Sequence, residues 1–253
     1  MIHEDIEATL NDFEKRYGEA YSDFRDAWIR TVTKKETFGA RRLIPFIGSG
    51  LNTFAVGGVM SWSKLVETIS VIMGQTPWSS HEFQKSGLGL TEKLQLMLSM
   101  CKEPEKRGQI IDAFENNFSK SGEPSDLHRR IISNFSHVAT TNYNQILSAA
   151  DVNRLVLDLT DLNDMARNPY LEEQAIIHLH GYWRLAESKE QKEDRIFRWV
   201  NPRDDSLGPM LVLTETQYHK LYARSLDFQL ALHELFSREN LCLFFPRLNH
   251  QCG

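Results

Sequence analysis

Short apolar runs, each about as long as one β-strand, alternate with segments of helical period along this chain of 253 residues. Continuous apolar runs are typical of strands that are buried on both faces of a sheet. Strands that alternate with helices indicate a parallel sheet with helices on both sides. The sequence therefore predicts an α/β fold with a doubly wound parallel sheet, and its strands are expected at residues 43–47, 137–140, 155–157, 175–179, 211–213 and 241–245.

The sequence also predicts a separate helical segment over residues 1–38. Apolar side chains recur there at steps of three or four, so one long amphipathic helix is expected over residues 2–33. Gly39 ends this helix, and residues 39–253 form a second unit that contains the sheet. Three helical patterns between Thr91 and Phe135 indicate a smaller helical lobe inserted between strands, at about residues 75–135.

The connecting segments carry weaker signals. Ser61 precedes a helical pattern that is expected to end near Gly74, and another helix is expected to begin at Gln145. Residues 74–90 are rich in Ser, Gly and Pro, which indicates a loop. Residues 186–206 are strongly charged and contain Pro202, so they are expected to form an exposed excursion.

Composition and charge exclude several classes of protein. Hydrophobic residues make up 41% and charged residues 25%, which is the mixture of an ordinary globular chain rather than a disordered or fibrous one. The chain has 34 acidic and 29 basic side chains, a formal net charge of -5, so it lacks the basic excess that nucleic-acid binding requires. No apolar stretch approaches the roughly 18 residues of a membrane span, and the N-terminal residues show no basic region leading into an apolar run. Neither secretion nor membrane insertion is therefore expected.

The cysteines point to a reducing compartment. Cys101, Cys242 and Cys252 include no CxxC pair, so they form neither a disulfide framework nor a four-thiolate zinc site. A cytoplasmic protein without a structural metal is expected. The sequence also contains no HExxH metal motif, no GxSxG elbow and no Walker loop, so metalloprotease, serine hydrolase and P-loop enzymes lose their best support.

Polar groups follow several of the predicted strands, where ligands bind in doubly wound sheets. Gly48-Ser49-Gly50 follows the first strand, and its glycines would let backbone N–H groups and the next helix N-terminus approach a diphosphate. A tight turn with no ligand is the alternative. Asn142 follows the second long run beside Thr141, and its amide can donate to and accept from ribose hydroxyls or water. The alternative role for Asn142 is an Asx turn or helix cap.

Two histidines compete for a role at the end of the predicted strand 175–179. His180 precedes Gly181, and the unperturbed pKa of a histidine suits a general acid or base near neutral pH. His178 lies deeper in the apolar run and is expected to be packed and hydrogen-bonded. Strand alternation would place both on the same side of the sheet, so periodicity does not choose between them. The remaining aromatic stripe is assigned to core packing, and it consists of Tyr218, Tyr222, Phe228 and Leu232.

Four segments in register resemble the sirtuin-like family, specifically its bacterial domains associated with anti-phage defence. They are residues 45–52, 59–65, 139–144 and 179–181, and the segment 213–218 looks like a further match. The resemblance implies a Rossmann-like NAD-binding domain that cleaves the bond between nicotinamide and ribose. It also implies that the asparagine contacts the nicotinamide ribose and that the histidine before glycine is the catalytic base. The catalytic pair is then Asn142 and His180, and the NAD-binding set is Gly48, Ser49, Gly50, Asn52, Thr141 and Asn142.

The chain departs from the family pattern in three places. Asn144 stands where aspartate is common, and the four-cysteine zinc ribbon of the protein-deacylating sirtuins is absent, which favours the hydrolase branch. Phe245-Pro246-Arg247-Leu248 stands where a glycine-containing turn would help to bind adenosine. The segment 246–253 is therefore expected to be poorly ordered, with the adenosine side of the site incompletely closed.

The resulting expectation is an NAD glycohydrolase that releases nicotinamide and ADP-ribose, acting as an NAD-depleting effector in defence. Such an enzyme needs regulation, so we expect a homo-oligomer and an associated defence protein or fused sensor, with no membrane or nucleic-acid partner. A catalytically weak module that senses NAD or ADP-ribose is the first alternative. NAD-dependent protein deacylation is the second.

Overall fold

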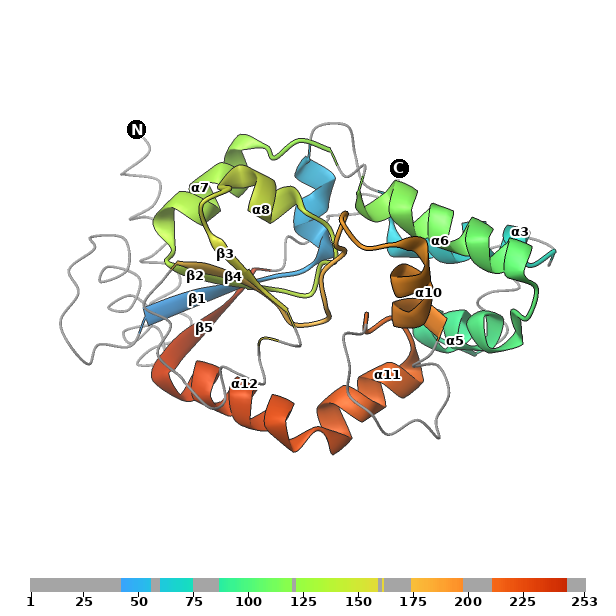
Figure 1. The fold of residues 1–253 in the computed structure, drawn as a ribbon. Coiled ribbons are helices and arrows are strands. Elements are labelled where there is room, and N and C mark those ends of the chain that lie inside the picture. Colours follow the sequence, from blue (N-terminus) through green and yellow to red (C-terminus); the bar gives the residue numbers. More distant parts are fainter. Residues whose placement is uncertain are drawn as a thin grey trace.

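The computed structural model describes residues 42–55, 60–74, 87–119, 122–158, 161, 174–197 and 211–244. Its centre is a five-stranded sheet in which every strand pair is parallel, with the spatial order β3-β4-β2-β1-β5 (Figure 1). This confirms the predicted α/β class and parallel sheet. The strands are β1 (Arg42–Ile47), β2 (His137–Thr140), β3 (Leu155–Leu157), β4 (Ala175–His178) and β5 (Glu239–Phe244).

Helices cover the two faces of the sheet. On one face, α7 (Asp126–Asn134), α8 (Ile146–Ala150) and the 3-10 helix η1 (Ser49–Phe54) pack against Val138 and Ile176. On the other face, α12 (Leu226–Arg238) places Phe228 against Ala139 and Ile177 (Figure 1). The central strands β2 and β4 are buried along their whole length, which explains why their sequences are continuously apolar rather than alternating.

Three helices form a separate hydrophobic cluster beside the sheet. They are α3 (Trp62–Ile72), α5 (Leu90–Met100) and α6 (Pro104–Phe118) (Figure 1). The Ser61 hydroxyl caps α3 by accepting from the Lys64 N–H, and Pro104 occupies the first turn of α6, where a missing N–H costs nothing. Phe114 and Trp183 are almost fully buried in this cluster, and each such side chain contributes about 1.5–3 kcal/mol by leaving water.

Two predicted elements differ in the structure. Residues 211–213 are not a strand of the sheet, although all three are buried. The backbone of Val212 instead forms hydrogen bonds with two other segments. Its N–H donates to the His180 carbonyl, and its carbonyl accepts from the Tyr143 hydroxyl. A buried apolar triplet therefore resembles a strand in sequence even when it only connects two elements.

The charged segment predicted as an exposed excursion, residues 186–206, is described only as far as residue 197. Residues Lys189–Phe197 form helix α10, which packs on α6. One side of this helix is exposed, as the composition predicts, and the other side is buried. Ile196 is fully buried, Lys192 reaches Glu115 at 2.7 Å, and Arg195 makes a two-oxygen contact with Glu187 at 2.9 Å. These ion pairs allow a charged helix to be partly buried.

The helical patterns after Thr91 divide between two parts of the fold. Helices α5 and α6 pack with α3, whereas α7 packs with α8 on the sheet. The predicted helix over residues 2–33, the loop residues 75–86 and the tail 246–253 lie outside the described residues.

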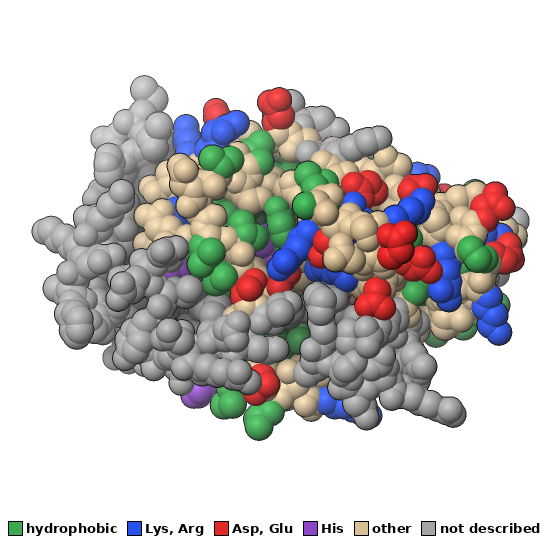
Figure 2. All heavy atoms as spheres, in the orientation of Figure 1, with side chains coloured by type: hydrophobic (Ala, Val, Ile, Leu, Met, Phe, Trp, Pro, Cys, Tyr) green, Lys and Arg blue, Asp and Glu red, His purple; other side chains and the backbone are tan. Residues whose placement is uncertain are grey.

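The surface shown in Figure 2 carries acidic and basic side chains interspersed over the side of the molecule where α6 and α10 lie. On this face they do not form a single-sign patch. Among the helices that the structure describes, none combines the length and the apolar character of a membrane span.

Candidate functional site

Three adjacent strand ends meet at one edge of the sheet. Ile47 of β1 pairs with Thr140 of β2, and Thr140 pairs in turn with His178 of β4. The glycine turn, Asn142 and His180 follow these three paired positions within a few residues. The structure therefore brings the predicted site segments to the carboxyl ends of neighbouring parallel strands, which is where ligands bind in open α/β sheets.

Gly48 begins the turn after β1. Its φ of -97° is accessible to any residue, and a Cβ atom added there would meet nothing within 4 Å. Glycine at this position is therefore not needed for internal packing, and the open space is available to a ligand. Ser49 is exposed and Gly50 is half-buried in the same turn.

The helix that follows the glycine turn differs from the expected one. It is η1, a 3-10 helix of six residues, and the first α-helix begins only at Trp62. An α-helix N-terminus therefore does not follow the turn directly. In this part of the structure, any diphosphate contact relies on the backbone N–H groups of the turn itself.

Asn142 is 5% exposed, and its side chain is hydrogen-bonded to the glycine turn and to the helix after it. Its Nδ2 donates to the Gly48 carbonyl and to Oδ1 of Asn52, both at 3.2 Å. Its backbone N–H donates to the Thr140 hydroxyl at 3.0 Å. With both Nδ2 protons used, Oδ1 of Asn142 is the atom that can still accept a hydrogen bond from a ligand hydroxyl. Thr141 is half-buried and donates its N–H to the Ile47 carbonyl at 3.2 Å.

The Asx turn proposed as an alternative role of Asn142 is made by its neighbour Asn144. Oδ1 of Asn144 accepts from the Ile146 N–H two residues later at 3.4 Å, just before α8. Asn144 is 3% exposed, so this side chain is committed to the fold. Asn142 instead bonds to residues some ninety positions earlier in the chain, which joins the ends of β1 and β2.

His178 is fully buried and hydrogen-bonded, as its position in the apolar run predicts. Its Nδ1 lies 2.7 Å from the Asn142 backbone oxygen, and its ring lies 4.6 Å from the ring of Tyr182. Burial lowers the pKa of His178 to about 4, although the bond to Asn142 acts in the opposite direction. The ring is therefore neutral at physiological pH.

His180 has different neighbours, because β4 ends at His178 and the alternation of the strand does not continue. Gly181 adopts a φ of +89°, a conformation that glycine supplies without strain, as the chain turns away. The His180 ring lies 6.4 Å from that of Tyr143. It is 6% exposed, and burial lowers its pKa to about 4.

Both nitrogens of the His180 ring contact a tyrosine hydroxyl. Nε2 lies 2.7 Å from the Tyr222 oxygen, and Nδ1 lies 3.3 Å from the Tyr218 oxygen. Tyr218 belongs to α11 (Glu215–His219), and Tyr222 belongs to the π-helical turn η3 (Lys220–Arg224). Their place in a stripe at helical spacing had predicted core packing for both tyrosines. Their spacing of four residues and their polar tips, on an otherwise apolar stripe, are the signal that could have identified them.

A buried carboxylate follows β3 and forms an ion-pair cluster that no sequence pattern predicted. Asp158 is 2% exposed and lies 2.8 Å from Nη2 of Arg184 and 3.9 Å from Nη2 of Arg195. Partial burial lowers the pKa of Arg184, but the Asp158 carboxylate acts in the opposite direction and the net shift is upward. Glu187 also pairs with Arg195, so two acidic and two basic groups balance, and the cluster is explained by the packing of α10.

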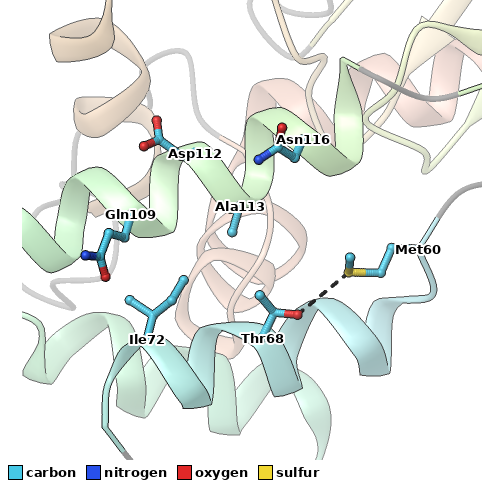
Figure 3. Close-up of a pocket in the computed structure, with 7 residues that line it drawn as sticks. All are labelled: Met60, Thr68, Ile72, Gln109, Asp112, Ala113 and Asn116. Carbon is cyan, nitrogen blue, oxygen red and sulfur yellow. Dashed lines mark hydrogen bonds between the residues drawn. The ribbon is translucent and has the colours of Figure 1, made fainter.

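A pocket of about 310 Å³ lies elsewhere, between α3 and α6 (Figure 3). Helix α3 contributes Thr68 and Ile72, and α6 contributes Gln109 and Ala113, whose side chains point toward α3 (Figure 3). Met60, Asp112 and Asn116 complete the lining. None of the predicted site residues lines this pocket. Among the described residues, no group of three or more His, Cys, Asp or Glu side chains is arranged to hold a metal ion.

Comparison with known proteins adds no relative to this picture. No protein-family model matches the chain, and a search of curated proteins found no significant match.

Proposed function

We propose that this protein hydrolyses NAD to nicotinamide and ADP-ribose at the edge where β1, β2 and β4 end. The observation that carries the proposal is the convergence of the Gly48 turn, Asn142 and His180 on three adjacent parallel strand ends. We further propose that the sheet and its two helical layers form a Rossmann-like NAD-binding domain. The resemblance of four segments to sirtuin-like defence domains supports the same reading.

Each group has a role that its environment supports. The open space at Gly48 lets the diphosphate approach the backbone. Asn142, with Nδ2 bound to the turn, directs Oδ1 toward a ribose hydroxyl or a water molecule. His180 is neutral at pH 7 because burial lowers its pKa, and a neutral imidazole can accept a proton. The negative charge of a bound diphosphate would raise that pKa and improve His180 as a base.

The biological setting belongs to the proposal as well. An enzyme that removes NAD endangers its own cell, so we propose that a homo-oligomer and an associated defence protein or fused sensor control its activity in the cytoplasm. The proposed ligand is NAD, which is the substrate, and the proposed reaction requires no metal ion.

Purified protein incubated with NAD provides the test, with nicotinamide release as the readout and an acylated peptide added in a parallel reaction. Release without the peptide supports hydrolysis. Release only with the peptide identifies a deacylase, and binding of NAD or ADP-ribose without release identifies a sensing module. The matched variants are His180→Gln, which should abolish release, and His233→Gln, an exposed residue of α12 that should leave it unchanged.

A further inference from the structure

Tyr222 shields His180 from solvent. The tyrosine is 40% exposed, whereas the histidine is 6% exposed, and the Tyr222 hydroxyl lies 2.7 Å from Nε2 of the imidazole. The nitrogen that would act as a base is therefore already engaged by a phenol. The phenol that contacts the buried imidazole is itself partly exposed.

Each nitrogen of the His180 ring faces one tyrosine hydroxyl. Nε2 lies 2.7 Å from the Tyr222 oxygen, and Nδ1 lies 3.3 Å from the Tyr218 oxygen. A neutral imidazole carries one N–H, so one of these nitrogens donates and the other accepts.

A proton path from a ligand through Tyr222 to His180 requires Nε2 to be the accepting nitrogen, with the Tyr222 hydroxyl as its donor at 2.7 Å. The proton of the neutral ring then lies on Nδ1, which faces the Tyr218 oxygen at 3.3 Å. This donor order, from Tyr222 to His180 to Tyr218, is the relay.

Ring contacts hold Tyr222 in place independently of its hydroxyl. Its ring stacks on that of Tyr218 at 6.1 Å and 12°, and it meets the edge of Phe228 at 5.1 Å. Its carbonyl accepts from Nε2 of Gln229 at 2.9 Å. The residue lies in a π-helical turn, a rare conformation that recurs at functional sites. Removing the hydroxyl alone would leave these contacts intact.

We propose that Tyr222 is a catalytic residue of the hydrolysis proposed above, and that His180 acts through it as the proton acceptor. The inference rests on that proposed function. A water oxygen bonds to C1′ of the nicotinamide ribose as the bond to the pyridine nitrogen breaks, and the electron pair leaves on nicotinamide. The water gives a proton to the Tyr222 oxygen while the Tyr222 proton moves to Nε2 of His180. The imidazolium then releases that proton to solvent, and ADP-ribose is the second product.

The test compares Tyr222→Phe with Tyr182→Phe in the full chain. The Tyr182 hydroxyl contacts Ser148 at 3.2 Å and does not contact His180, so it is the matched control. Tyr222→Phe is expected to lower kcat at least ~100-fold with little change in KM, and Tyr182→Phe is expected to leave both within about threefold. The double variant Tyr222→Phe/His180→Gln should be no slower than His180→Gln, because both changes interrupt one proton path.

Two outcomes separate the inference from the function on which it rests. If the wild-type protein releases nicotinamide and folded Tyr222→Phe keeps its kcat, only the role of Tyr222 is wrong. If the wild-type protein releases none, the proposed function is wrong and the relay is rejected with it.

The imidazole tautomer supplies a measurement that does not depend on turnover or on the folding of a variant at Tyr222. Nitrogen-15 correlation spectra of the wild-type protein, assigned with His180→Gln, should show the His180 proton on Nδ1. A proton on Nε2 would reverse the donor order and overturn the relay.

Discussion

The Asn142 backbone oxygen lies 2.7 Å from Nδ1 of His178, so a single hydrogen bond ties the segment after β2 to the end of β4. The carbonyl can only accept, which places the imidazole proton on Nδ1. Nε2 has no hydrogen-bond partner among the described residues and is buried. The bond fixes the backbone of Asn142, whose side chain in turn holds the glycine turn after β1.

Replacement of His178 by alanine is therefore expected to act on stability more than on turnover. The change removes a fully buried ring and a hydrogen bond, which should cost about 2–4 kcal/mol in free energy of unfolding. Urea denaturation of His178→Ala and of the exposed control His233→Ala provides the comparison. Loss of NAD cleavage in a folded, equally stable His178→Ala protein would instead give His178 the role assigned to His180.

Stability should fall as the solution is acidified below neutrality. Burial lowers the pKa of both His178 and His180 to about 4, below the ordinary value of 6.5 that they regain on unfolding. The unfolded chain therefore binds more protons between these values, and the contribution of the neutral rings is complete above pH 6.5 and lost as the pH falls toward 4. Each histidine should account for up to about 3 kcal/mol of that loss.

Denaturation midpoints at pH 7.5, 6.0 and 5.0 check this expectation. His180→Gln should show a shallower decline than the wild-type protein, because glutamine does not titrate. An identical pH dependence in the two proteins would mean that His180 does not have a lowered pKa.

The sequence predicted the edge of the sheet better than it predicted the surroundings of that edge. Continuous apolar runs predicted β1, β2, β3 and β4 within a residue or two. The reason is clearest for β2 and β4, because strands buried along their whole length do not alternate with polar residues. Parallel pairing then placed Gly48, Asn142 and His180 together. Residues 211–213 satisfied the same pattern without joining the sheet, since burial alone makes a segment apolar.

Contacts between residues that are distant in sequence explain the features that the sequence did not predict. Helix α10 is charged, yet it packs through ion pairs with Glu115 and Glu187. Glu115 is far from α10 in the sequence, so no local pattern predicts that partner. Tyr222 belongs to an apolar stripe by spacing, but a π-helical turn between α11 and α12 brings its hydroxyl to His180. Asn142 and Asn144 are chemically alike, and only the fold decides that Asn144 forms the Asx turn before α8.

Gly48→Val should weaken NAD binding without unfolding the protein. The backbone at Gly48 is compatible with valine, and the added Cβ has no protein atom within 4 Å. The free energy of unfolding should therefore change by less than about 1 kcal/mol, while the branched side chain occupies the space proposed for the diphosphate. Calorimetry with ADP-ribose measures the affinity, and unchanged binding in a folded variant would remove the phosphate site from this turn.

Chelation should leave activity intact. The three cysteines are separated in sequence, and the described residues contain no cluster of three or more metal-binding side chains. Nicotinamide release measured before and after EDTA treatment should agree within experimental error. Activity that is lost with EDTA and restored by zinc would contradict this expectation.

Comparison of Asn142→Ala with Asn52→Ala distinguishes two roles of Asn142, which are contact with the ligand and support of the glycine turn. Both variants remove the same 3.2 Å bond between the two side chains, but only Asn142→Ala also removes the Oδ1 acceptor proposed for the ribose and water. Asn142→Ala is expected to reduce turnover at least ~100-fold, and Asn52→Ala less than about tenfold, mainly through KM.

The combination of Asn142→Ala with His180→Ala should be markedly less than additive, because both residues serve one transition state and the second change has little stabilisation left to remove. Single-turnover rates of the folded single and double variants measure this coupling. Equal losses in Asn142→Ala and Asn52→Ala would show that Asn142 acts by holding the turn, since the bond between the two side chains is the interaction that both variants lose. Full additivity with His180→Ala would place the two side chains in independent steps, and the shared site at the ends of β2 and β4 would then have to be abandoned.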